Sequence, residues 1–111
     1  MQDIYDYIEA HVDESIATLL ELVAQPSVSA ARIGFDKAPG LVKSKLEEVG
    51  LETEIWPTEN DGLPSVFGKA DGDADGTLLF YTHYDVQPPE PLELWETEPF
   101  KPERRGDRIF G

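Results

Sequence analysis

The fold is decided by the stretch Thr77-Leu78-Leu79-Phe80-Tyr81-Thr82-His83-Tyr84-Asp85-Val86-Gln87-Pro88. It begins as a short apolar run, which is typical of a strand buried on both faces of a sheet. The run becomes polar at His83 and Asp85, and side chains two apart on a strand point to the same side. We therefore expect the imidazole and the carboxylate to lie together where an inner strand leaves the core.

This pair of side chains has the chemistry of a metal site. Ligands of open α/β sheets bind at the carboxyl ends of the strands. A carboxylate can accept the ring N–H of a neighbouring histidine, which fixes the tautomer and makes the other ring nitrogen a better ligand. A His-x-Asp sequence is also common by chance, and a buried structural histidine is the alternative interpretation.

The length and the residue types limit the class of protein. A chain of 111 residues is one small domain or part of a larger one. It has no cysteine, which excludes disulfides and thiolate metal sites and suits a reducing compartment such as the cytoplasm. No stretch approaches the roughly 20 apolar residues of a membrane span. The N-terminus has no basic segment, so we expect no signal peptide.

The charge is strongly acidic. Lys and Arg number 9 against 23 Asp and Glu, for a net charge of −14. Such a surface repels nucleic acid and anionic membranes, so we expect neither as a partner. The acids are spread along the whole chain, which leaves two interpretations open: a halophile's cytoplasmic protein or an ordinary acidic protein.

Two helices are predicted before the decisive stretch. Apolar residues recur at helical spacing over residues 3–24, and Pro26 ends that pattern. We expect His11 at the surface or boundary of this helix rather than as a ligand. A second helix is predicted from Lys37 to Val49, capped by Gly50. Its buried stripe is expected to comprise Ala38, Leu41, Val42, Leu46 and Val49.

Strands are predicted on both sides of the decisive stretch. Residues 51–56 alternate like a half-exposed strand, and residues 64–70 form a second one. Residues 100–104 and 108–110 read as the arms of a hairpin that turns at Gly106-Asp107. Prolines exclude regular structure from much of the loop after Pro88. Four apolar side chains there are expected to pack down: Leu92, Leu94, Trp95 and Phe100.

Two further motifs have simpler explanations. Asp71-Gly72-Asp73-Ala74-Asp75-Gly76 matches the first half of a calcium loop, but Thr82 stands where the final glutamate belongs. A solvated turn is the better interpretation, and a calcium-binding protein is the alternative. Arg105-Gly106-Asp107 spells an adhesion tripeptide, and a hairpin turn explains it better.

Four segments of the second half carry a likeness to a known family. They are Tyr81-Thr82-His83-Tyr84-Asp85-Val86-Gln87-Pro88, Leu94-Trp95, Pro99-Phe100 and Gly106-Asp107-Arg108-Ile109-Phe110-Gly111. Together they resemble the first metal motif of the M20 family of zinc-dependent metallopeptidases and deacylases, with the segment behind it. The sequence of residues 83–88, His-Tyr-Asp-Val-Gln-Pro, is most similar to that of the dipeptidase branch, which includes carnosine-type dipeptidases. The predicted helices and early strands also fall in the family's order.

The resemblance implies a fold and a reaction. Residues 1–111 would be the N-terminal part of an α/β catalytic domain, with three αβα layers and a mixed central sheet. His83 would be a ligand of one zinc in a two-zinc centre, and Asp85 the partner acid that orients it. In the family, the metals lower the pKa of a shared water, a glutamate acts as general base, and the hydroxide attacks an amide carbonyl. The implied substrate is a small peptide or an N-acyl amino acid. A second, lid-like domain usually holds the substrate's carboxylate and forms the family's dimers.

The sequence departs from the family by ending at Gly111, before the family's bridging aspartate, its Glu-Glu pair and its lid domain. A catalytic zinc takes about three protein ligands, so His83 alone cannot hold one. We therefore expect the 111-residue chain by itself to bind metal weakly and to have no hydrolase activity. A single histidine does not choose among zinc, cobalt and manganese. Two interpretations stay open: the N-terminal portion of an amide hydrolase, or a non-catalytic module or pseudo-enzyme that kept the fold.

Overall fold

The computed structural model describes residues 1–111 and contains two compact units. The terminal unit combines Met1–Gln25 with Pro89–Gly111, and the middle unit is Pro26–Pro88. None of the helices has the combination of length and apolar character that crossing a membrane requires.

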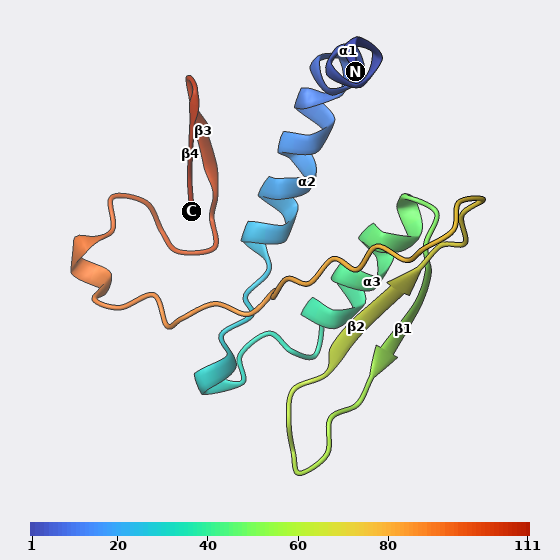
Figure 1. Cartoon of the computed structure of the whole chain (residues 1–111). Helices are drawn as coiled ribbons and strands as arrows, with labels where there is room; N and C mark the ends of the chain where they lie inside the picture. Colours follow the sequence, from blue (N-terminus) through green and yellow to red (C-terminus); the bar gives the residue numbers. More distant parts are fainter. The chain divides into compact units, whose positions relative to one another are not determined.

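The middle unit is built on a helix packed against a pair of strands (Figure 1). Helix α3, Ala38–Glu48, contacts both β1, Glu52–Trp56, and β2, Ser65–Lys69. The strands pair antiparallel, and their register places Glu54 opposite Phe67. All three elements agree with the predicted helix and strands, so local periodicity was sufficient to find them.

Glycine allows the helix to approach the strands closely. A Cβ atom built on Gly68 of β2 would lie 3.2 Å from Leu51 Cδ1 and 3.4 Å from Leu46 Cδ1. Both distances are tight for carbon atoms, whose optimal separation is about 3.5–4.0 Å. Leu46 on α3 and Leu51 before β1 therefore pack over the bare backbone of Gly68.

The predicted cap of α3 at Gly50 is confirmed. Gly50 has φ +88°, the left-handed conformation that glycine adopts without a steric cost. Its N–H donates to the Glu47 carbonyl at 2.9 Å, and the Leu51 N–H donates to the Leu46 carbonyl at 3.1 Å. These two bonds form a Schellman motif. Val49, which we assigned to the buried stripe, is instead 73% exposed, because it stands at the turn that leaves the helix.

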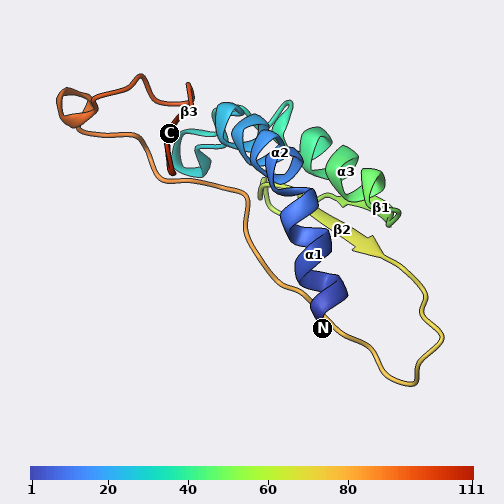
Figure 2. The ribbon, with the colours of Figure 1, turned by 90° about the horizontal axis from the view of Figure 1, so that it is seen from above.

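The prediction of an inner strand over Thr77–Thr82 is wrong for this structure. The segment contains no strand and makes no backbone hydrogen bond. It runs as an open loop beyond β2 (Figure 2). The exposed fractions of four of its residues are 78% for Leu78, 79% for Leu79, 84% for Phe80 and 92% for Tyr81. A buried strand needs hydrogen-bond partners and covered faces, and no segment of the chain supplies either here.

Two of the most buried residues of the middle unit, Ser27 and Val28, lie where its two ends meet. Val28 and Ala38 are each 2% exposed, and Ser27 is 5% exposed. Val28 forms isolated β-bridges to Ile33 and, in parallel, to Val86. A short 3-10 helix, η1, occupies Ser29–Ala31 within the predicted loop.

In the terminal unit, the prediction of one continuous helix over residues 3–24 is wrong, because the helix is interrupted at one residue. Helix α1, Gln2–Ala10, and helix α2, Val12–Ala24, are separated by His11, and their axes diverge there (Figure 1). His11 Nδ1 contacts the Tyr7 carbonyl oxygen at 2.7 Å, and its ring stacks on the Tyr7 ring. The His11 backbone N–H also donates to the Tyr7 carbonyl, at 3.1 Å, so this one carbonyl is shared by the ring and the backbone of His11. The prediction of a boundary histidine is confirmed, and α2 ends two residues before Pro26.

The predicted hairpin is also confirmed in the terminal unit, but its first arm begins at Glu103 rather than at Phe100. Strand β3, Glu103–Arg105, pairs antiparallel with β4, Arg108–Phe110. Gly106 has φ +64° at the first turn position, where two-residue hairpin turns favour glycine. The Arg105-Gly106-Asp107 tripeptide is thus the turn itself. Arg104 Nη1 lies 2.9 Å from Asp13 Oδ1, which joins the hairpin to α2.

The loop between Pro89 and the hairpin packs less closely than we predicted. It contains a short 3-10 helix, η2, at Leu92–Leu94. Leu92 is 60% exposed and Leu94 is 75% exposed, so the expected packing is wrong for both. A single helical turn with prolines on either side reaches no apolar neighbour that could cover these side chains. Phe100 is half-buried, as predicted.

Candidate metal centre

His83 and Asp85 contact each other, although the segment that carries them is not a strand. His83 Nδ1 lies 3.2 Å from Asp85 Oδ1 and 2.9 Å from the backbone carbonyl oxygen of Asp85. Both oxygens are acceptors, so Nδ1 is the donor, and in the neutral ring this tautomer has its lone pair on Nε2. The His83 side chain is 75% exposed, and Nε2 makes no hydrogen bond. A buried structural histidine is excluded.

The surroundings of Asp85 favour its charged form. A hydrogen bond from the Ser29 hydroxyl lowers the pKa of the Asp85 carboxyl, partial burial opposes that shift, and the nearby His83 adds to it. The group is therefore an ionised acceptor for the ring N–H. An ionised carboxylate raises the basicity of the imidazole that donates to it, which strengthens a ligand nitrogen.

The backbone on either side of Asp85 is anchored by Ser27. The Ser27 hydroxyl donates to the Tyr84 carbonyl at 2.6 Å, and the Val86 N–H donates to the Ser27 carbonyl at 3.0 Å. These bonds hold the segment beside the loop that follows Gln25. After the unpaired Thr77–Thr82 segment, the backbone is thus hydrogen-bonded to another part of the unit again from Tyr84 onward.

The Tyr84 side chain provides a second anchor. Its hydroxyl donates to the Pro64 carbonyl, and its ring lies 5.7 Å, centroid to centroid, from the ring of Phe35. Partial burial raises the pKa of the Tyr84 phenol, and the neighbouring Asp85 charge raises it further. Tyr84 is therefore a neutral donor packed within the middle unit, and the exposed His83 ring precedes it directly.

The chain brings together one histidine and one acid, and no larger set of ligands. No group of three or more His, Cys, Asp or Glu side chains is placed to hold a metal ion. Asp71–Gly76 is an exposed turn, as the simpler interpretation predicted. In His83, Nδ1 is engaged by Asp85 and Nε2 is open, which is the arrangement that an imidazole ligand with an orienting carboxylate requires.

The sequence interpretation missed the two residues that hold the pair in place. Tyr84 was quoted only as part of the motif, and Ser27 was placed in a loop without a role. The available signal was weak: a serine directly after Pro26, followed by Val28 and Ser29. Only the fold shows that these residues lie beside residues 84–86, which are 57 positions later for the Ser27–Tyr84 bond.

No protein-family model matches the chain. Individual proteins do. It is 29% identical over 100 residues to a succinyl-diaminopimelate desuccinylase of Xylella fastidiosa, covering 82% of this chain and 22% of the relative. It is 34% identical over 117 residues to a Cys-Gly metallodipeptidase of Candida albicans, covering 90% of this chain and 24% of the relative. The chain therefore spans about a quarter of the length of these relatives.

The chain is also similar to a solved structure, which provides a comparison of the fold. The chain matches the crystal structure of an M20 family metallo-carboxypeptidase from Sulfolobus solfataricus with a TM-score of 0.80 and 36% identity. The match covers 86% of this chain and 22% of that one. The likeness confirms the predicted α/β fold class.

Proposed function

We propose that the chain belongs to the M20 family of metallopeptidases, and that His83 and Asp85 serve the metal centre of a zinc-dependent amide hydrolase. His83 Nε2 is the metal ligand, and Asp85 is the acid that orients the ring. The observation that carries the proposal is the contact between His83 Nδ1 and Asp85 Oδ1, which occupies Nδ1 and leaves the exposed Nε2 free to face a metal ion.

These residues supply only part of such a centre. A bound divalent ion would supply Lewis-acid activation of water and of the substrate carbonyl. His83 would hold the ion through Nε2, and the Asp85 carboxylate would keep the proton on Nδ1 throughout. Since about three protein ligands are needed for a catalytic zinc, further ligands must come from outside these 111 residues. We propose two zinc ions in the complete centre, with cobalt or manganese as possible substitutes.

The substrate class follows from the relatives. A desuccinylase and a dipeptidase both have names that describe cleavage of an amide bond. We propose a small peptide or an N-acyl amino acid as substrate of a longer protein that carries this chain. We also propose that such a protein forms homodimers and works in the cytoplasm, without nucleic-acid or membrane partners. The net charge of −14 supports the last point, because it repels both.

The chain's two histidines offer a direct test of the metal site. We expect Zn²⁺, added to the 111-residue chain, to shift the imidazole NMR signals of His83 and to leave those of His11 nearly unchanged. His83→Ala should abolish the binding, and His11→Ala is the matched control. Equal responses of both histidines would contradict the proposed site.

In a longer protein that carries the chain, the roles of the two residues separate. His83→Ala should remove the ion at one metal position and abolish turnover. Asp85→Ala should weaken metal binding by about 10- to 100-fold, the usual effect of losing a partner that orients a ligand. Metal analysis of the purified variants measures both. Full zinc occupancy with full activity in His83→Ala would show that the assignment is wrong.

A further inference from the structure

We propose that Ser27 is a positioning residue for the metal centre: its buried hydroxyl and its carbonyl clamp the peptide groups on both sides of Asp85, and so hold Asp85 against His83. The role of the pair as ligand and orienting acid rests on the proposed function. The clamp itself is a matter of geometry and holds without a metal.

The clamp is formed by one residue at two points. The Ser27 hydroxyl donates to the carbonyl of Tyr84 at 2.6 Å, and the Ser27 carbonyl accepts from the N–H of Val86 at 3.0 Å. Asp85 is the single residue between these two peptide groups. Its backbone is therefore held by Ser27 on both sides, which limits the positions that its carboxylate can take.

Burial makes the hydroxyl bond significant. Ser27 is 5% exposed, and its neighbour Val28, which is 2% exposed, forms the parallel bridge to Val86. Water has little access to Ser27. Removal of the hydroxyl would leave the Tyr84 carbonyl without the partner that it has in the fold, and an unsatisfied buried acceptor costs more than an exposed one.

The surroundings show what the segment does without such a clamp. Residues 77–82, just before the pair, form no backbone hydrogen bond and are largely exposed. Tyr84, the residue between His83 and Asp85, is held at two points: its side-chain hydroxyl donates to the Pro64 carbonyl, and its backbone carbonyl accepts from Ser27. A hydrogen bond from the Ser29 side chain to Asp85 supports the same placement. Residues 27–29 thus contact both the backbone around Asp85 and its carboxylate, and together they keep Asp85 in place.

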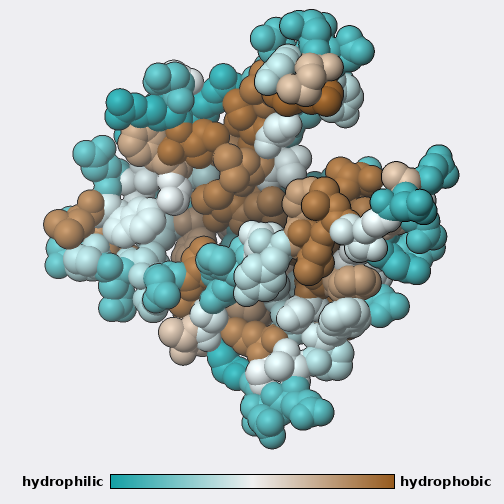
Figure 3. Space-filling model, viewed as in Figure 1, coloured by the Kyte–Doolittle hydropathy of each residue, from teal (hydrophilic) through white to brown (hydrophobic).

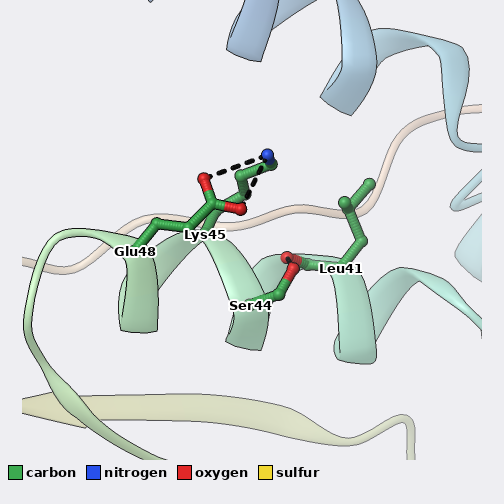
Figure 4. Close-up of polar contacts among 4 residues, drawn as sticks. All are labelled: Leu41, Ser44, Lys45 and Glu48. Atoms are coloured by element: carbon green, nitrogen blue, oxygen red, sulfur yellow. Dashed lines mark hydrogen bonds and ion pairs between the residues drawn. The ribbon is translucent and has the colours of Figure 1, made fainter.

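The test compares two serine variants of the metal-free 111-residue chain. Ser27→Ala removes the clamp hydroxyl. Ser44→Ala is the matched control, because the Ser44 hydroxyl donates to the Leu41 carbonyl at 2.8 Å in a part-buried position of α3 (Figure 4) and not to the segment that carries the pair. Hydrogen exchange of the Val86 amide and the ¹⁵N shifts of the His83 ring are the measurements. The ring shifts report which nitrogen carries the proton.

We expect Ser27→Ala to speed exchange of the Val86 amide by about threefold to tenfold, the value of one hydrogen bond. The ¹⁵N shifts of His83 should move toward a mixture of tautomers, because Asp85 no longer stays in place. Ser44→Ala should leave both measurements unchanged. Amide protection of β1 and β2 should stay constant in both variants, which shows that the fold is retained. If Ser27→Ala does not fold, Ser27→Cys keeps nearly the same volume with a much weaker donor.

Two outcomes would overturn the clamp: Val86 exchange and His83 shifts that stay unchanged in a folded Ser27 variant, or equal changes in Ser44→Ala. The second would show a general loss of stability. A result of either kind is distinct from failure of the metal proposal. Zn²⁺ that does not bind at His83 would contradict the proposed function and leave the metal-free measurements valid.

Discussion

Two apolar segments of the middle unit differ in structure: one forms a paired strand, and the other forms an exposed loop. Ser65–Lys69 pairs with Glu52–Trp56 and is covered by α3, whereas Thr77–Thr82 pairs with nothing. The second segment is the more apolar of the two, yet its residues Leu78 to Tyr81 are 78–92% exposed. Apolar, strand-forming residues make a strand possible, and hydrogen-bond partners with a covering layer make it form.

The unpaired segment leaves apolar surface uncovered. The sheet of β1 and β2 has only these two strands, so each has one free edge. Figure 3 shows apolar residues, in brown, at the surface of the face drawn. Free strand edges and large apolar patches favour association, so we expect the isolated chain to aggregate at high concentration.

The largest loss of stability should follow a change in the layer that covers the strands. Leu46→Ala removes a half-buried side chain that packs beside Gly68, and we expect a loss of about 2 kcal/mol in the free energy of unfolding. Val49→Ala, in the 73% exposed residue that follows α3, should cost much less. Chemical denaturation followed by circular dichroism measures both. Equal losses would mean that α3 does not stabilise the strand pair.

A smaller effect should follow a change in the connection from α3 to β1. Gly50→Ala forces alanine into φ +88°, and we expect a loss of about 1 kcal/mol. Gly40→Ala is the control, and we expect it to raise stability rather than lower it. Gly40 lies within α3 with no atom within 4 Å of an added Cβ, so alanine should raise helix stability by about 0.5–1 kcal/mol. Thermal melting of both variants gives the signs, and a stabilising Gly50→Ala would contradict the Schellman geometry.

The anchoring of Tyr84, which lies just after the unpaired Thr77–Thr82 segment, can be tested by pH. The pKa of Tyr84 is raised above 10.0 by partial burial and then by the Asp85 charge. A raised pKa in the folded state means that the stability contribution is complete below pH 10.0 and is lost as pH rises through the folded-state pKa. The difference in tyrosinate absorbance between the chain and Tyr84→Phe isolates this titration. A difference curve centred at or below 10.0 would show that Tyr84 is not packed in solution.

The smallest effect should come from the free segment itself. Phe80 is 84% exposed, so Phe80→Ser should change the free energy of unfolding by less than about 0.5 kcal/mol. The same variant should reduce self-association, which analytical ultracentrifugation measures. A large loss of stability would show that this segment packs in solution, and the difference between the two segments would then disappear.

The sequence predicted the elements whose signals are local. Helix α3 and its end at Gly50 follow from apolar spacing and one glycine, and the hairpin at Gly106 follows from its turn residues. The break at His11 was not predicted, because Tyr7 and His11 contact each other through a backbone carbonyl and a ring stack that periodicity does not describe. The inner strand at Thr77–Thr82 was predicted wrongly, because its formation depends on partners and not on its own residues.

The same division applies to the candidate site. The sequence alone determined that an imidazole and a carboxylate stand two residues apart after an apolar run, since side-chain chemistry and spacing are written in the chain. Only the tertiary structure decided that Asp85 meets Nδ1 and leaves Nε2 open, and that Ser27 holds the acid in place. Contacts between residues 57 positions apart, as for Ser27 and Tyr84, depend on how the whole unit packs.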